Sequence, residues 1–337
     1  MTLKIHFLLT LIVWVGLPPH AWAEEKTKQQ EATEGSAAEF EGPADLKAKA
    51  EKGDPQSQFS LGDFALTNKF NLPQAIKWFR KAAEQGHAAS QYNLGYVYAN
   101  GHGVLKDQTE AVRWYRKAAE QGHAGSQYNV GVAYANGHGV PKDEVEAVRW
   151  YLKAAEQGKG FAQHNLGFAY AEGRGVSKDE AEAVKWWRKS AEQGHVGSQH
   201  NLGFMYANGH GVPKDEAEAL KWYLKAAEQG DANSQYNVGV AYANGHGVPK
   251  DEAEAVRWFR KGAEQGDADS QNNLAVKYAL GEGVPKDDVL AYKWILLAGA
   301  KQEKSRKTIP LIEQPLTSAQ RAEGQKLARE FKPVVQK

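Results

Sequence analysis

Histidines and carboxylates return along this chain at spacings that could serve acid–base or metal chemistry. Aspartate and glutamate stand three positions apart in several places, as Asp107 and Glu110 do. Four Gly-x-Gly segments have a histidine in the middle: His102, His138, His210 and His246. A catalytic site needs one constellation in one place, whereas a residue type that returns in every copy of a repeat is expected to support the fold. We therefore interpret the Asp-x-x-Glu pairs as helix capping boxes rather than as a general acid and base.

The four histidines are not predicted to bind a metal ion. Neighbouring helical hairpins pack about 10 Å apart, whereas a ligand nitrogen lies about 2 Å from zinc. Two successive turns cannot easily share an ion, and Arg174 and Glu282 replace the histidine in two copies. The sequence also contains no Gly-x-Ser-x-Gly, phosphate-loop, dinucleotide-binding or His-Glu-x-x-His pattern. We therefore predict no catalytic residue, no metal and no cofactor.

A repeat with a period of 36 positions organises the whole chain. Tryptophans follow this period at Trp78, Trp114, Trp150, Trp186, Trp222, Trp258 and Trp294. Glutamines follow it at Gln91, Gln127, Gln163, Gln199, Gln235 and Gln271. A period of this length is typical of stacked supersecondary units, none of which can bury its apolar face alone.

Each repeat is predicted to be a helix–turn–helix hairpin. In one copy the second helix begins after Asp107 and ends before Gly122, where a left-handed cap favours glycine. Its apolar face has helical spacing: Ala111, Trp114, Tyr115, Ala118 and Ala119. The shorter first helix has its own buried side: Gln91, Leu94, Gly95 and Tyr98. The segment Gly101-His102-Gly103-Val104 makes the turn between them.

These residues resemble the Sel1-like repeat family, a relative of the tetratricopeptide repeats. The resemblance is in SQYNLGYVYANGHGVLKD and AVRWYRKAAEQG, which follow one another between Ser90 and Gly122. It implies an all-α, right-handed α/α solenoid whose members mostly act as adaptors that hold other proteins together. Some exported relatives pair cysteines within each repeat, but this chain has no cysteine. Their reported link to β-lactam hydrolysis therefore transfers poorly.

The chain divides at changes of composition. Residues 1–23 are predicted to be a signal peptide, residues 24–43 a flexible leader, and residues 44–53 a half-repeat that caps the array. Residues 303–337 are predicted to be a linker and a C-terminal capping helix that covers Ile295, Leu296 and Leu297. Seven repeats fill residues 54–302, with bounds 54–86, 87–122, 123–158, 159–194, 195–230, 231–266 and 267–302.

The N-terminal segment predicts export. Lys4 gives a weak positive start, residues 7–17 form an apolar core too short to span a bilayer, and Ala21-Trp22-Ala23 fits a cleavage site. No later stretch is long and apolar enough to cross a membrane. We therefore expect a mature chain in the periplasm or outside the cell. Without disulfides, its stability must come from repeat stacking.

Positions that vary while the scaffold repeats are the candidates for binding. On the first helices, the side opposite the packing residues has aromatic, histidine or apolar side chains where a solvated face would be charged. The candidates for partner binding are Tyr92, Tyr96, Tyr128, Phe161, His164, Phe168, His200, Phe204 and Tyr236. The alternative is that these rings fill space between neighbouring first helices and only complete the core.

Two classes of function fit this pattern. The first is an exported, monomeric adaptor that binds a protein or peptide in the concave groove of the solenoid, without catalysis. The second is a glycan-binding, or glycan- or β-lactam-hydrolysing, protein of the cell envelope, for which Glu172 is the one unusual carboxylate of the face. The formal net charge of +1 gives no reason to expect nucleic acid. We favour the adaptor.

Overall fold

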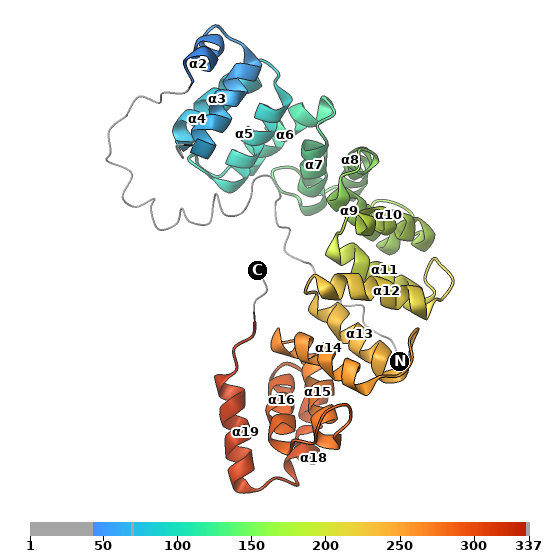
Figure 1. Ribbon diagram of the computed structural model, residues 1–337. Coiled ribbons are helices and arrows are strands. Elements are labelled where there is room, and N and C mark those ends of the chain that lie inside the picture. The colour runs from blue at the N-terminus through green and yellow to red at the C-terminus, as the bar shows by residue number, and fades with distance from the viewer. Residues whose placement is uncertain (1–42, 69–70, 335–337) are drawn as a thin grey trace. The chain divides into compact units, whose positions relative to one another are not determined.

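Paired helices follow one another along the chain in the computed structural model, which describes residues 43–68 and 71–334 (Figure 1). The predicted signal peptide and all but the last residue of the predicted leader lie outside the described residues. The chain forms two compact units, residues 1–107 and residues 108–337. Neither unit has a β-strand among its described residues, so the predicted all-α class is confirmed.

The first unit consists of helices α2 (Ala44–Glu51), α3 (Pro55–Asn68), α4 (Leu72–Glu84) and α5 (Ala88–Asn100). The second contains α6 (Gln108–Glu120), α7 (Ala124–Asn136), α8 (Glu144–Glu156), α9 (Gly160–Glu172), α10 (Glu180–Glu192), α11 (Val196–Asn208), α12 (Glu216–Glu228), α13 (Ala232–Asn244), α14 (Glu252–Glu264), α15 (Ala268–Leu280), α16 (Asp288–Lys301), α17 (Glu303–Arg306), α18 (Ile309–Glu313) and α19 (Ser318–Glu330). Within each unit a first helix packs on its own second helix, which packs on the next first helix. This is the connectivity of an α/α solenoid.

Helix caps repeat as regularly as the apolar residues do. The carboxylate of Asp143 accepts the backbone N–H of Glu146 at 3.0 Å, as the sequence predicts for the start of a second helix. The Asp143 N–H donates to the Tyr134 carbonyl at 2.9 Å instead of to the Glu146 side chain, so the reciprocal half of the predicted capping box is wrong at this helix. Three first helices begin with a histidine cap that the sequence did not reveal: His87, His123 and His195.

Glycines let the helices and turns approach closely. An ideal Cβ on Gly167 would lie 2.4 Å from the Trp187 ring, so a first helix rests directly on an aromatic side chain of its second helix. In the turn, Gly139 has a left-handed φ of 72°, and a Cβ there would lie 2.2 Å from the Gln108 carbonyl oxygen. Each such turn is therefore seated on the start of the preceding second helix.

A buried ladder of glutamines joins the repeats. Gln163 is 4% exposed; its Nε2 donates to the Ala155 carbonyl of the preceding second helix at 3.1 Å. Its Oε1 accepts from Gln193, the cap residue of its own second helix, at 2.7 Å. The same two bonds recur at Gln127, Gln199 and Gln235, each with the glutamine thirty positions later and an alanine carbonyl eight positions earlier. The periodic glutamines of the sequence are therefore inter-repeat connectors.

The C-terminal segment packs on the last repeat. Helix α19 packs on α16, where Gly324 lets it approach the Tyr292 ring. Ile295 is fully buried, and the Phe331 ring meets the Trp294 ring edge-on with centroids 5.4 Å apart. The short helix α18 shares in this cover through buried Ile312. None of the described helices combines the length and apolarity needed to cross a bilayer.

Candidate partner-binding face

All nine candidate residues lie on first helices. Tyr92 and Tyr96 belong to α5 of the first unit. The others lie in the second unit: Tyr128 on α7, Phe161, His164 and Phe168 on α9, His200 and Phe204 on α11, and Tyr236 on α13. We call the candidates on α9 and α11, from Phe161 to Phe204, the aromatic face. It is the stretch in which aromatic and histidine side chains are densest.

Two of the nine side chains belong mainly to the packing between repeats. Tyr128 is 8% exposed, and its ring lies 6.0 Å from Tyr151 and 6.1 Å from Phe161, centroid to centroid. Burial raises the pKa of the Tyr128 hydroxyl to about 12. His164 is 9% exposed. The positions of these two side chains therefore fit the alternative interpretation, in which the rings fill space between repeats.

The other candidates are half-buried. Phe161 meets His195 edge-on at 5.1 Å, and Phe168 meets Trp187 edge-on at 5.5 Å. Phe204 stacks on His210 of its own turn at 5.9 Å and packs against the cores of two successive repeats. Such rings combine a fixed orientation with a remaining accessible edge, which is the arrangement of an aromatic anchor at an interface.

His164 is part of a buried polar network between α9, α10 and α11. Ser198 donates its hydroxyl to Ser190 at 2.9 Å, and Ser190 donates to the Gly160 carbonyl at 2.8 Å. The Ser198 oxygen is therefore left to accept from His164 Nδ1, which lies 2.8 Å away. His195 Nδ1 accepts the backbone N–H of Ser198 at 3.2 Å, and its ring centroid is 4.3 Å from that of His164.

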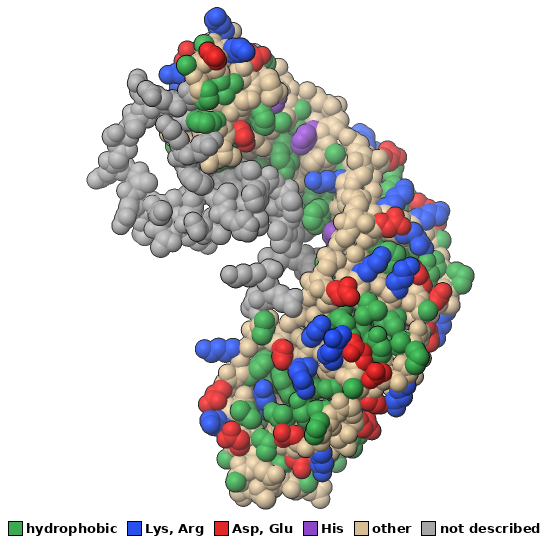
Figure 2. All heavy atoms as spheres, in the orientation of Figure 1, with side chains coloured by type: hydrophobic (Ala, Val, Ile, Leu, Met, Phe, Trp, Pro, Cys, Tyr) green, Lys and Arg blue, Asp and Glu red, His purple; other side chains and the backbone are tan. Residues whose placement is uncertain are grey.

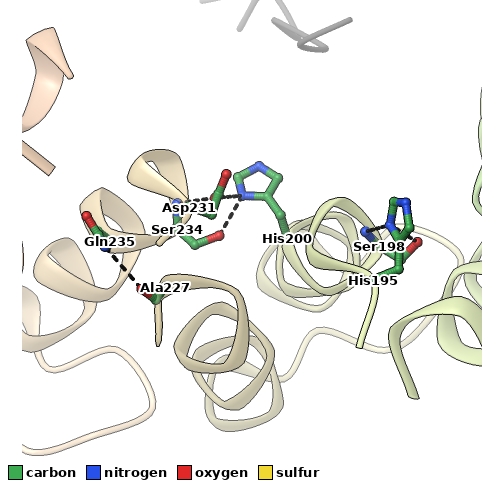
Figure 3. Close-up of polar contacts among 7 residues, drawn as sticks. All are labelled: His195, Ser198, His200, Ala227, Asp231, Ser234 and Gln235. Carbon is green, nitrogen blue, oxygen red and sulfur yellow. Dashed lines mark hydrogen bonds and ion pairs between the residues drawn. The ribbon is translucent and has the colours of Figure 1, made fainter. Parts of the chain in front are cut away.

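His200 has a different partner at the next junction (Figure 3). Its Nδ1 lies 2.9 Å from the Ser234 hydroxyl oxygen and 3.4 Å from an Asp231 carboxylate oxygen. Burial alone would raise the pKa of the Asp231 carboxyl, but hydrogen bonds from His200 and Ser234 outweigh burial and hold that pKa below its usual value.

The Ser234, His200 and Asp231 set is not arranged as a nucleophilic triad. In a triad the serine and the carboxylate bind opposite nitrogens of the imidazole. Here both lie on Nδ1, and Ser234 is fully buried. Glu172, the unusual carboxylate in the sequence, lies exposed as the last residue of α9.

One of the turn histidines contacts a carboxylate one repeat earlier. His210 Nδ1 lies 3.5 Å from Glu180, the first residue of the preceding second helix. Within the part of the chain that the structure describes, no group of three or more histidine, aspartate or glutamate side chains could hold a metal ion. The contact follows from the seating of each turn on a helix start.

Several polar residues next to the aromatic face were missed in the sequence, because each differs from the repeat by one small change. Ser190 stands where other repeats have Ala118, Ala154 or Ala226, and it is the link between Ser198 and the Gly160 carbonyl. His195 and Asp231 occupy the same cap position in consecutive repeats. Comparison of repeats position by position would have singled out Ser190 and the change from His195 to Asp231.

Charged side chains of both signs are interspersed over the visible surface of the second unit (Figure 2). Many form exposed pairs three residues apart on second helices, such as Arg149 with Glu146 and Lys185 with Glu182. Exposed pairs of this kind contribute little to stability. They mark the second helices as solvated, in contrast to the first helices.

The comparisons with known proteins agree with this architecture. The family model described as the Sel1 repeat matches residues 55–87, 88–123, 124–159, 160–195, 196–231, 232–267 and 268–302. A crystal structure of a Sel1 repeat protein from Oxalobacter formigenes is 35% identical, with a TM-score of 0.63, and the similarity covers 73% of this chain and 97% of that one.

Two further relatives are more distant. A protective antigen of uropathogenic Escherichia coli strains, displaying an SLR fold, is 28% identical over 85% of this chain and 93% of that one, with a TM-score of 0.50. The uncharacterized protein YibG of Escherichia coli K12 is 28% identical over 90 residues, which are 25% of this chain and 59% of that protein. Sel1 repeat solenoids are generally scaffolds for protein interaction. With seven matched repeats over most of its length, the chain belongs to the Sel1 repeat family.

Proposed function

We propose that this protein is an exported, monomeric scaffold that binds a protein or peptide partner on the aromatic face. The observation that carries the proposal is the half-buried state of Phe161, Phe168 and Phe204, each held on one side by a neighbouring ring. Rings whose orientation is already fixed by a neighbouring ring lose little conformational freedom when a partner covers them, which favours their use as anchors.

The chain supplies its own conservative substitution for the test. The position of Phe168 and Phe204 is occupied by Val132 and Val240 in other repeats. These valines pack in the same repeat-to-repeat setting, so a Phe-to-Val change keeps a side chain that the scaffold already accommodates. Phe168→Val and Phe204→Val should therefore remove most of the aromatic surface that a partner could contact, while the packing between repeats is preserved.

The partner recovered from cell-envelope extract with the tagged protein would be purified and its Kd measured against the parent and both variants. An anchor worth about 2 kcal/mol corresponds to an affinity loss of about thirtyfold. We expect that loss, with little change in melting temperature. An unchanged Kd in both variants would contradict the proposal, and would assign the rings to the core if the melting temperature fell instead.

A further inference from the structure

Histidine occupies one position of the first helix in two consecutive repeats only. Aligned with His164 and His200 are Tyr92, Tyr128, Tyr236 and Asn272. Each of the two histidines reaches across to the serine and the cap residue of the following repeat. The cap residue is His195 at the first junction and Asp231 at the second. The two junctions therefore have the same geometry, but the histidine faces a second imidazole at the first junction and a carboxylate at the second.

We propose that the junction between the fourth and fifth repeats, where His164 and His195 face each other, is a pH-sensitive joint that acidification weakens. At the next junction the carboxylate of Asp231 takes the place of the second imidazole, so we expect no such weakening there. The inference does not rest on the proposed function, because it concerns the stability of the chain alone.

The hydrogen-bond directions leave no place for an added proton at the first junction. His164 already donates from Nδ1 to Ser198, so a second proton would have to sit on Nε2, inside the packed junction. His195 uses Nδ1 as the acceptor that caps α11, so protonation of that nitrogen breaks the cap. Each added proton therefore costs either burial of charge or a hydrogen bond.

The surrounding elements offer no compensating charge in their contacts with this pair. Helix α10 contributes Ser190 and Trp187, whose Nε1 donates to the His164 carbonyl at 3.1 Å, and α9 contributes Phe161 and Phe168. The turn before α11 contributes His195, whose charge disfavours protonation of His164. The carboxylate of Asp231 belongs to the next junction, where it contacts His200.

The direction of the effect follows from linkage. Burial lowers the pKa of His164 well below its usual value, and the proximity of His195 adds to this; burial also lowers the pKa of His195. In an opened junction both would return toward about 6.5. Stability contributed by the neutral pair is therefore complete above that pH and is lost as the pH falls below it. The equilibrium constant for opening the junction rises by up to about tenfold for each histidine when the pH falls by one unit.

Amide hydrogen exchange measured by mass spectrometry on the full chain tests this joint. Protection factors, corrected for the pH dependence of chemical exchange, are compared at pH 7.5 and pH 5.0 for peptides of α9–α11 and of α13–α15. We expect protection in α9–α11 to fall at least about tenfold more than in α13–α15. At pH 5.0 the Asp231 cap of α13 stays ionised, because hydrogen bonds from His200 and Ser234 hold its pKa below the usual value of about 3.9. Burial raises the pKa of the Asp267 cap of α15, so the peptides of α13 are the stricter reference.

The matched variant is His195→Asp, which installs the cap residue that the chain uses at Asp231 and Asp267. It should abolish the acid-induced difference between the two regions. His164→Tyr, the residue found at Tyr128 and Tyr236, should reduce it, and far-UV circular dichroism at pH 7.5 verifies that both variants are folded. Equal loss of protection in both regions of the parent, or an undiminished difference in folded His195→Asp protein, would overturn the proposal.

Discussion

At the scale of single residues, the glutamine ladder makes one buried side chain responsible for two connections. Gln163→Ala would remove the donor to the Ala155 carbonyl and the acceptor for Gln193. Leaving buried polar groups without partners costs about 1–3 kcal/mol each. We therefore expect a loss of about 2–5 kcal/mol in the free energy of unfolding, measured by urea denaturation.

The end of the ladder provides the control for that prediction. Gln271 donates to the Ala263 carbonyl at 3.1 Å, but its Oε1 has no hydrogen-bond partner, because Lys301 stands where the other repeats have the second glutamine. Gln271→Ala should therefore cost less than Gln163→Ala by about one hydrogen bond, roughly 1 kcal/mol. Equal losses at the two sites would show that the bond to the second glutamine contributes nothing.

Residue types that repeat were predictable from the sequence, and residue partners were not. The period identified Gln163 as important, but a side chain that pairs with residues eight positions back and thirty positions ahead has no local signature. Likewise the histidine cap at His195 replaces the usual Ser, Thr, Asp or Asn. Half-burial of the aromatic face depends on how neighbouring helices are spaced, which a helical wheel of one helix does not contain.

At the scale of elements, the C-terminal helix α19 should be indispensable to the last repeat. Removing residues 317–337 would uncover the Tyr292 and Trp294 rings and would remove the hydrogen bond from the Val334 N–H to the Glu264 carbonyl. Exposing apolar surface of this size costs more than about 2 kcal/mol, which lowers the melting temperature by at least about 4 °C. Circular dichroism melting and size-exclusion chromatography measure the loss.

The truncated protein should keep the helix content of the remaining repeats, because each repeat depends mainly on its neighbours. A truncated protein that stays monomeric with an unchanged melting temperature would show that α19 gives no cover. The helical spacing in the sequence does not show which side of this helix faces inward. Ala319 and Ala322, which follow helical spacing with Leu327 and Phe331, are exposed, and Gly324 makes the close contact instead.

At the scale of the whole molecule, the expectation of export rests on residues 1–23, which lie outside the described residues. If the Ala21-Trp22-Ala23 site is cleaved, the mature chain begins at Glu24. Intact-mass spectrometry of the protein recovered from the periplasm or medium should find that N-terminus. A membrane-bound species that still carries residues 1–23 would contradict it.

The bond that crosses each junction of the glutamine ladder also bears on how such a chain can change its length. Within the second unit, a glutamine of each repeat donates to the backbone carbonyl eight positions earlier, in the preceding repeat, so a duplicated or deleted unit of 36 residues meets the same partner on both sides. After the seventh repeat the equivalent carbonyl, that of Gly299, accepts from Arg306 Nε at 2.7 Å instead. Gene duplication can therefore extend the array from within, while a unit appended after the seventh repeat would find this carbonyl already used.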